Sequence, residues 1–393
     1  TRLLLLVLLV SVSVLFLGCP NLLGNIFDTG SEEEEEQTTD DTDTGGDDGG
    51  GDTTPDTSRS DTAASNLESD LQAAGLSSTQ IAAIKDSAVG AISDAGLSGS
   101  TDSQAILTTL VSGGQKGLSG SGFDDDDRLA AIEAIVGSAV GSIGNLSTSS
   151  LGIRASATDD IVAEIVATSV STVGQSGFDE TERTSRRQAA GKAAGGAVKN
   201  LRDAGVTRDQ VVPTVGKITR RGVESLGTGG FNGDDAGDAV SSLTRGAISS
   251  INEAGVEGFD VNRELRYVTR EVASQATKNL GNSGIGDLDD DDVQNAIQGV
   301  SRGATGAIKD VTITGDQAEI DQTINDITNE VTRSVTESLR DLNESGTVTV
   351  DVKITVNVVV RGATEGIKEA SENSAYSNSV SGALQEAVKG AST

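Results

Sequence analysis

The chain has 393 residues, a net charge of −31, 2% aromatic residues, and no Met, Trp or His. The chain has no His, and Cys19 is its single cysteine. It therefore lacks the usual zinc ligands, a second cysteine for an internal disulfide, and the base for nucleophile–His catalysis. The negative charge disfavours nucleic acid as a partner and any broad attraction to anionic lipid. We therefore expect no metal site, no cofactor and a core of aliphatic side chains.

The N-terminus is typical of an exported protein. Arg2 precedes an apolar run from Leu3 to Leu17, and these 15 residues are fewer than the roughly 20 that span a bilayer as a helix. The segment Leu15-Phe16-Leu17-Gly18-Cys19 resembles the lipobox of bacterial lipoproteins, in which a small residue precedes the cysteine that receives the lipid. The resemblance implies a signal peptide over residues 1–18 and a lipid on Cys19. A non-cleaved anchor, or a signal peptide followed by an incidental cysteine, is the alternative.

Residues 19–64 are predicted to form a disordered acidic tether. Between positions 28 and 62 there are 14 acidic residues and one base, Arg59, and Glu32 to Glu36 are consecutive. Low hydrophobicity and repulsion between like charges leave such a segment unfolded and extended. We expect it to hold a folded region, residues 65–393, away from the membrane.

A short pattern of small and aliphatic residues recurs six times in that region. Each copy has an alanine followed four residues later by a β-branched residue. The alanines are Ala88, Ala139, Ala194, Ala247, Ala304 and Ala363, and looser aliphatic anchors lie between the copies at Leu118, Val173, Leu226, Leu280 and Leu339. From Ile92 to Ile367 there are 275 residues in ten steps, or 27.5 residues per step, which suits one helix and a short loop.

Local signals support helices joined by tight turns. Apolar residues such as Ile84, Ala88 and Ile92 follow helical spacing. Helix ends are marked by a glycine before an apolar residue, because glycine adopts the left-handed conformation that ends a helix and the next side chain folds back onto the last turn. These pairs are Gly122-Phe123, Gly177-Phe178, Gly205-Val206, Gly230-Phe231, Gly258-Phe259 and Gly284-Ile285. A residue able to cap the next helix, such as Asp124, Thr207 or Asp260, often follows.

These patterns predict an all-α fold over residues 65–393. We expect an array of antiparallel helical hairpins, with about 11 to 12 helices, helix units of about 27 residues and hairpin repeats of about 55, forming either a solenoid or an elongated bundle. Glycine in the middle of a helix costs about 1 kcal/mol relative to alanine, so its recurrence predicts a close approach of neighbouring helices. Drift in a low-complexity sequence is the alternative.

Two stretches conflict with this pattern. Pro213 falls about six residues into the helix that Thr207 would start, so that helix either begins late, near Val212, or kinks. Residues 347–360 alternate valine or isoleucine with other residues and, taken alone, indicate a β-strand. The repeat instead places them at the start of a helix, and we favour the helix because an isolated strand would leave its backbone groups unpaired.

The aspartate runs do not have the spacing of a calcium loop. If Asp287, Asp289 and Asp291 were the first ligands, Asp292 would stand where an EF-hand needs glycine and Gln298 where it needs glutamate. Acids in a first helical turn instead complement the helix dipole and cap free amides, which is our interpretation of Asp124 to Asp127 as well. A hydrolase that uses paired carboxylates remains an alternative, although no pair is singled out.

One stretch departs from the acidic background. Residues 183–223 hold ten bases and two acids, a local charge of +8. Within it, Arg186, Arg187, Arg220 and Arg221 are candidate anion-binding residues. A docking patch for an anionic envelope component, such as phosphate groups or an acidic polysaccharide, is one interpretation. The other is that these bases pair with acidic neighbours such as Asp159, Asp160 and Glu164.

Taken together, the sequence favours a lipid-anchored, extracytoplasmic protein at the outer membrane or cell surface. We expect a non-enzymatic binding or scaffold protein of the cell envelope, attached to the membrane by its N-terminal lipid, whose partner is an anionic envelope component or another protein. A surface-adhesion or ice-binding-like protein and the carboxylate hydrolase are the alternatives. A flat, regular face of threonines would favour the first alternative, and a deep pocket with clustered acids would favour the second.

Overall fold

The computed structural model describes residues 58–120, 122–147, 155–178, 183–285, 290–346 and 352–392. Within them the secondary structure is entirely helical and no strand is formed, so the predicted all-α fold is confirmed. The first helices are α2 (Ser58–Ala73), α3 (Ser78–Asp94), α4 (Ser103–Gly117), α5 (Asp125–Ser147) and α6 (Ala155–Thr172). The middle helices are α7 (Arg183–Lys199), α8 (Arg208–Glu224), α9 (Gly233–Ser249) and α10 (Val261–Lys278). The last are α11 (Asp290–Gly306), α12 (Gln317–Glu344), α13 (Val352–Ala370) and α14 (Val380–Ala391).

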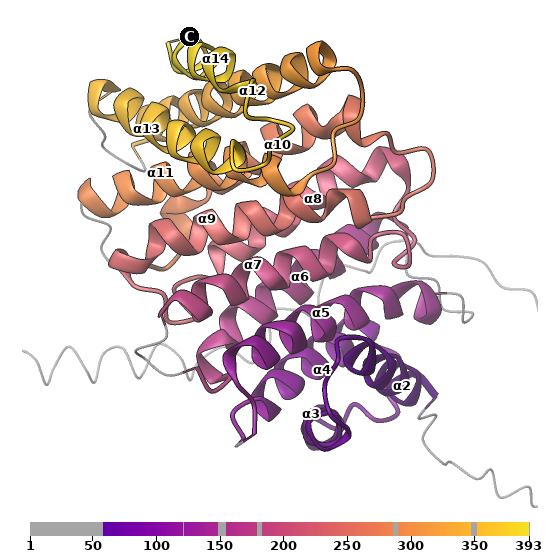
Figure 1. Ribbon diagram of the computed structural model, residues 1–393. Coiled ribbons are helices and arrows are strands. Elements are labelled where there is room, and N and C mark those ends of the chain that lie inside the picture. Colours follow the sequence, from indigo (N-terminus) through magenta and orange to yellow (C-terminus); the bar gives the residue numbers. More distant parts are fainter. Residues whose placement is uncertain are drawn as a thin grey trace, which may run out of the picture. The chain divides into compact units, whose positions relative to one another are not determined.

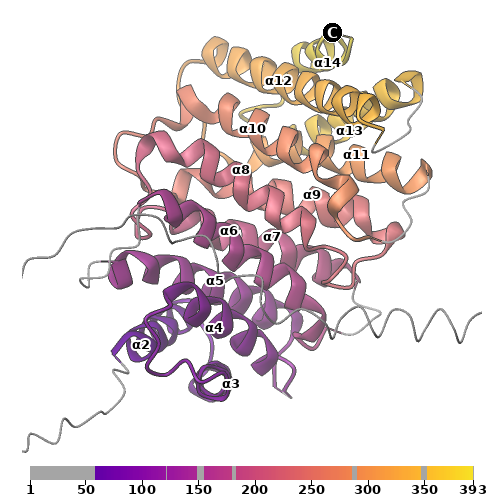
Figure 2. The same ribbon diagram turned by 180° about the vertical axis from the view of Figure 1, so that it is seen from behind.

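The helices of residues 54–393 stack in two layers. From α4 to α12, each helix packs against the helix two places later in the chain, so α5, α7, α9, α11 and α13 form one layer (Figure 1). The other layer is formed by α4, α6, α8, α10, α12 and α14. It lies in front when the molecule is seen from the opposite side (Figure 2). Helices α3 and α14 lie at opposite ends of the stack in both views. The stack is therefore an open α-solenoid, which decides between the two predicted arrangements.

The first helices depart from this alternation. Helix α3 carries the first copy of the repeated pattern, yet it packs on α4 and lies in the α4 layer, while α2 packs on α5. Glycines of α4 permit the contact, since a Cβ on Gly113 would lie 2.9 Å from the carbonyl oxygen of Ser87. The beginning of the solenoid is thus built from two consecutive helices in one layer.

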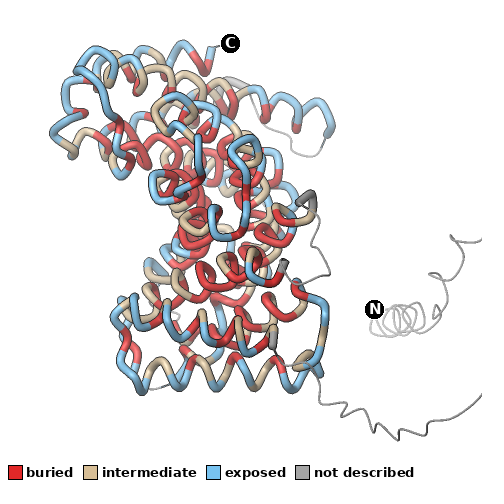
Figure 3. Tube along the Cα trace, turned by 90° about the vertical axis from the view of Figure 1, so that its right-hand side faces the viewer, coloured by how far each residue is buried: buried red, intermediate tan, exposed pale blue. Residues whose placement is uncertain are grey.

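The predicted repeat positions form the core between the layers. All six pattern alanines are at most 1% exposed, and the five looser anchors are at most 3% exposed. Buried residues run along the interior of the stack, and exposed ones lie on its outer sides (Figure 3). The register found in the sequence is therefore a packing register.

Close approach of helices within the α5–α13 layer is also confirmed. A Cβ on Gly246 of α9 would overlap the carbonyl oxygen of Gly191 of α7, and one on Gly299 of α11 would overlap that of Gly237 of α9. Backbone contacts of this kind replace the bulky side chains that the chain lacks. They explain why glycine is retained inside helices despite its cost in helix propensity.

The turns follow the predicted signals. All six glycines predicted to end helices have positive φ, including Gly205 at 81° and Gly230 at 78°. Phe231, which follows Gly230, is 3% exposed, as expected for a side chain folded back onto the core. Thr207 forms a capping box with Gln210 at the start of α8, and Asp260 accepts a hydrogen bond from the Arg263 amide at the start of α10.

The structure corrects the helix count and two helix starts, and it decides one point that the sequence left open. The described residues contain 13 α-helices, and the first begins at Ser58, so residues 58–64 belong to the helical region and not to the tether. Helix α8 begins at Arg208 and continues through Pro213, so the late start near Val212 is wrong. Residues 352–360 are helical, as favoured over the strand, while 347–351 lie outside the described residues.

Helix α5 contains the one candidate membrane span found among the described residues. Residues Asp125–Leu146 are long and apolar enough to cross a membrane by length and composition alone, and 67% of the apolar window is buried. In this structure α5 packs on α2, α4, α6 and α7. It is a core helix of the solenoid here.

Candidate functional site

Arg186 and Arg187, the first candidate pair, are engaged within the α5–α13 layer. Arg187 is 20% exposed and bonds the buried Asp235 at 3.1 Å through Nε and Asp238 at 2.6 Å through Nη1, both from α9. Arg186 donates to the carbonyl oxygens of Gly229 at 3.0 Å and Gly230 at 3.1 Å. Both arginines therefore hold neighbouring repeats together.

Arg220 and Arg221, the second pair, lie in the other layer and reach solvent. Arg220 is 51% exposed and pairs with Glu224 at 3.0 Å. Arg221 is 43% exposed and pairs with Glu224 and with Glu164 of α6. Lys217 also bonds Asp159 and Asp160, each at 2.6 Å. The predicted pairing of this basic stretch with Asp159, Asp160 and Glu164 is confirmed, and the four arginines do not form one cluster.

The remaining sequence candidates separate into two groups. Cys19, the predicted lipidation site, lies outside the described residues. Asp124 accepts a hydrogen bond from the Asp127 amide at 2.8 Å, and Asp125 pairs with Arg128 at 3.1 Å, so the acids at the start of α5 cap that helix as predicted. Among the described residues, no group of three or more Cys, Asp or Glu residues is placed to hold a metal ion.

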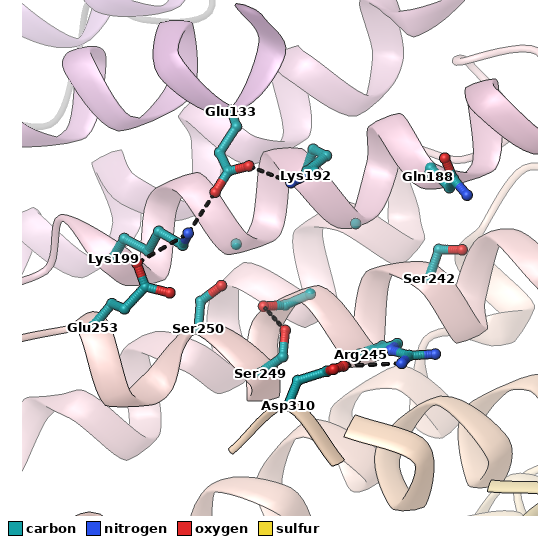
Figure 4. Close-up of a pocket in the computed structure, with 13 residues that line it drawn as sticks. Glu133, Gln188, Lys192, Lys199, Ser242, Arg245, Ser249, Ser250, Glu253 and Asp310 are labelled. Carbon is teal, nitrogen blue, oxygen red and sulfur yellow. Dashed lines mark hydrogen bonds and ion pairs between the residues drawn. The ribbon is translucent and has the colours of Figure 1, made fainter. Parts of the chain in front are cut away.

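The structure contains a polar groove that the sequence analysis did not identify (Figure 4). It has a volume of about 550 Å³ and lies over α7 and α9. Gly191 and Gly195 of α7 and Gly246 of α9 line it, and because these residues have no side chains the space above the helix contact stays open. Helical spacing places Gln188, Lys192 and Lys199 on the same side of α7.

The charges of the groove balance one another. Glu133 of α5 bonds Lys192 at 2.6 Å and Lys199 at 2.7 Å, and Lys199 also pairs with Glu253 at 3.0 Å. At the other side Arg245 pairs with Asp310 at 2.9 Å. Three bases therefore face three acids, which suits a polar ligand better than a strongly charged one.

Protonation in the groove follows from these contacts. Burial raises the pKa of Glu133, but the hydrogen bonds from Lys192 and Lys199 outweigh it and hold the pKa below the ordinary value. Burial lowers the pKa of Lys199, but the hydrogen bonds from Glu133 and Glu253 outweigh it and hold the pKa above the ordinary value. Both residues are therefore charged at neutral pH.

Uncharged groups supply the free hydrogen-bonding capacity of the groove. The amide of Gln188 and the hydroxyl of Ser242 line it and make no hydrogen bond with any part of the chain that the structure describes (Figure 4). They come from facing helices, α7 and α9, so a ligand could bond both. The sequence signal that could have located them is the register of small residues four apart on both helices.

Comparison with known proteins gives no family for this chain. No protein-family model matches it, and no curated protein matches its sequence.

Proposed function

We propose that the chain is an exported, lipid-anchored, non-enzymatic binding and scaffold protein of the cell envelope. Cys19 carries the lipid, the acidic segment that follows it is the spacer, and the solenoid presents a surface to an extended partner. The signal-like N-terminus and its lipobox resemblance support the anchoring. A row of similar depressions on the solenoid supports the binding role.

The depressions follow one another where successive turns meet. The first, about 600 Å³, lies between the turn around Val206 and the turn around Val256. The second, about 600 Å³, includes Phe259 and Thr312, and the third, about 580 Å³, includes Arg263 and Glu319. Both lie between the turn around Val256 and the turn around Ile313, and Thr314 lines both. The first depression and the other two therefore lie at consecutive pairs of turns, one hairpin repeat apart, so a chain-like partner could contact them in succession.

Anchoring is tested by fractionating cells that express the full chain or its Cys19→Ala variant. The full chain should be found with the membranes, and the variant should be released. Mass spectrometry of the membrane-bound protein should show a lipid on Cys19, and an unmodified thiol there would contradict the anchoring.

Binding is tested by photo-crosslinking on intact cells. A photo-reactive amino acid replaces Glu257, which is exposed and lines the first depression, or Asp86, an exposed acid on α3 away from the row. A discrete adduct with an envelope component is expected from position 257 only. No adduct at 257, or the same adducts at both positions, would count against the proposal.

A further inference from the structure

The outer side of α10 carries three arginines without an acidic partner. Arg263, Arg266 and Arg270 are exposed and form no ion pair within the described residues. Arg187 and Arg221, by contrast, are each held by two acids. In a chain with a net charge of −31, three free arginines on one helix are a local reversal of sign.

Helical spacing places these arginines in one ridge. They occupy positions i, i+3 and i+7, so they follow one another over about 10 Å along two turns of the helix. The opposite side of α10, with Leu265, Val268 and Val272, is fully buried. The ridge therefore points away from the core.

Acidic groups near the ridge are engaged with other residues. Glu264 of α10 accepts a hydrogen bond from Arg208 at 2.7 Å. A hydrogen bond of 3.0 Å from Ser334 to the carbonyl of Arg270 fixes the register with α12, which brings Glu330 alongside, and Glu330 pairs with Arg333 at 2.7 Å.

The start of the ridge has further acids around it. Asp260 caps α10 through the Arg263 amide. Asp316 and Glu319, which share the third depression with Arg263, form the capping box of α12. These acids hold helix termini and form no ion pair with the three guanidinium groups, whose positive charge is left for a ligand.

An aromatic ring completes the ridge. Tyr267 is 43% exposed and is the only exposed aromatic side chain among the described residues, where Phe123, Phe178 and Phe231 are buried. The Arg266 guanidinium lies 4.7 Å from the Tyr267 ring centroid and donates to its hydroxyl at 2.8 Å. These contacts hold the ring in place among the three arginines.

We propose that the α10 ridge, defined as Arg263, Arg266, Tyr267 and Arg270, binds an acidic polysaccharide. Guanidinium groups match carboxylates with paired hydrogen bonds, and an exposed tyrosine ring offers a flat apolar face to a sugar ring. A glycan with spaced carboxylates satisfies both features. A nucleic acid fits less well because its dense charge meets the repulsion of the whole chain. This inference deepens the proposed binding function and rests on it.

The test measures binding of the purified full chain in detergent to polygalacturonate, a carboxylated polysaccharide, with dextran and an oligothymidylate as comparison probes. The ridge variant combines Arg263→Gln, Arg266→Gln and Arg270→Gln. A matched control, Lys116→Gln with Arg340→Gln and Lys368→Gln, removes the same charge from exposed bases that also lack ion pairs within the described residues but lie in separate places.

Polygalacturonate should bind the wild type in preference to both other probes. The ridge variant should bind it at least about tenfold more weakly, because charged hydrogen bonds are lost, while the control changes little. Tyr267→Ala should weaken binding and Tyr267→Phe should retain it. Equal loss in ridge and control variants, preference for oligothymidylate, or no binding of polygalacturonate by the wild type would overturn the proposal. Because the assay needs no membrane, its failure is distinguishable from failure of anchoring at Cys19.

Discussion

The contact between α7 and α9 allows a prediction in which one chemical change has opposite effects at two sites. In an ordinary helix, replacing glycine by alanine stabilises by about 0.5 to 1 kcal/mol, since alanine has the higher helix propensity. At Gly246 the added Cβ would overlap the backbone of Gly191, so the two helices would have to separate. Overpacking typically costs about 1 to 3 kcal/mol. We therefore expect Gly246→Ala to destabilise the protein.

Gly90 of α3 supplies the matched control. It is also inside a helix, but a Cβ there would have no neighbour within 4 Å. Gly90→Ala should raise the melting temperature followed by far-UV circular dichroism, and Gly246→Ala should lower it. In a chain of this length the shifts are about 1 to 2 °C per kcal/mol, because the unfolding entropy grows with length. Shifts of the same sign and size would refute the view that glycine is retained for helix contact.

Further predictions concern the core, the groove and the arginines. Ala194→Leu should overpack a fully buried site and cost about 1 to 3 kcal/mol in thermal or denaturant unfolding. Glu133 has a lowered pKa, so its contribution to stability is present above the ordinary value of 4.5 and is lost as the pH falls through the folded-state pKa. The melting temperatures of wild type and Glu133→Gln should therefore converge in acid, and a constant difference would contradict this reasoning. Arg187→Gln should cost about 2 kcal/mol or more because the buried Asp235 loses its hydrogen-bonded partner and keeps only Arg183, at 3.9 Å, whereas Arg220→Gln, at an exposed pair, should cost less than about 1 kcal/mol. Equal losses in these two variants would show that burial of the pair is not decisive.

Much of the candidate site was not predictable from the sequence. The +8 stretch was visible as a charge excess, but which arginines stay free depends on acids from other repeats. Arg187 meets Asp238, 51 residues away, and Arg221 meets Glu164, 57 residues away. The ridge on α10 has no comparable excess, because Glu264 and Glu271 dilute it in sequence. Only the structure shows that Glu264 pairs with Arg208, which leaves the ridge arginines without an acidic partner on their own helix.

The sequence by itself determined the local structure of this protein. Glycine followed by an apolar residue ends helices through backbone conformation, and the alanine register marks the buried side of each helix, so both could be recognised from neighbouring residues. The same register correctly placed residues 352–360 in a helix despite their alternating pattern. Only the tertiary structure decided that the helices form an open stack of two layers and that α3 shares a layer with α4. The physical reason is that these arrangements depend on contacts between helices about 55 residues apart, where small residues permit several ways of packing and no local signal selects one.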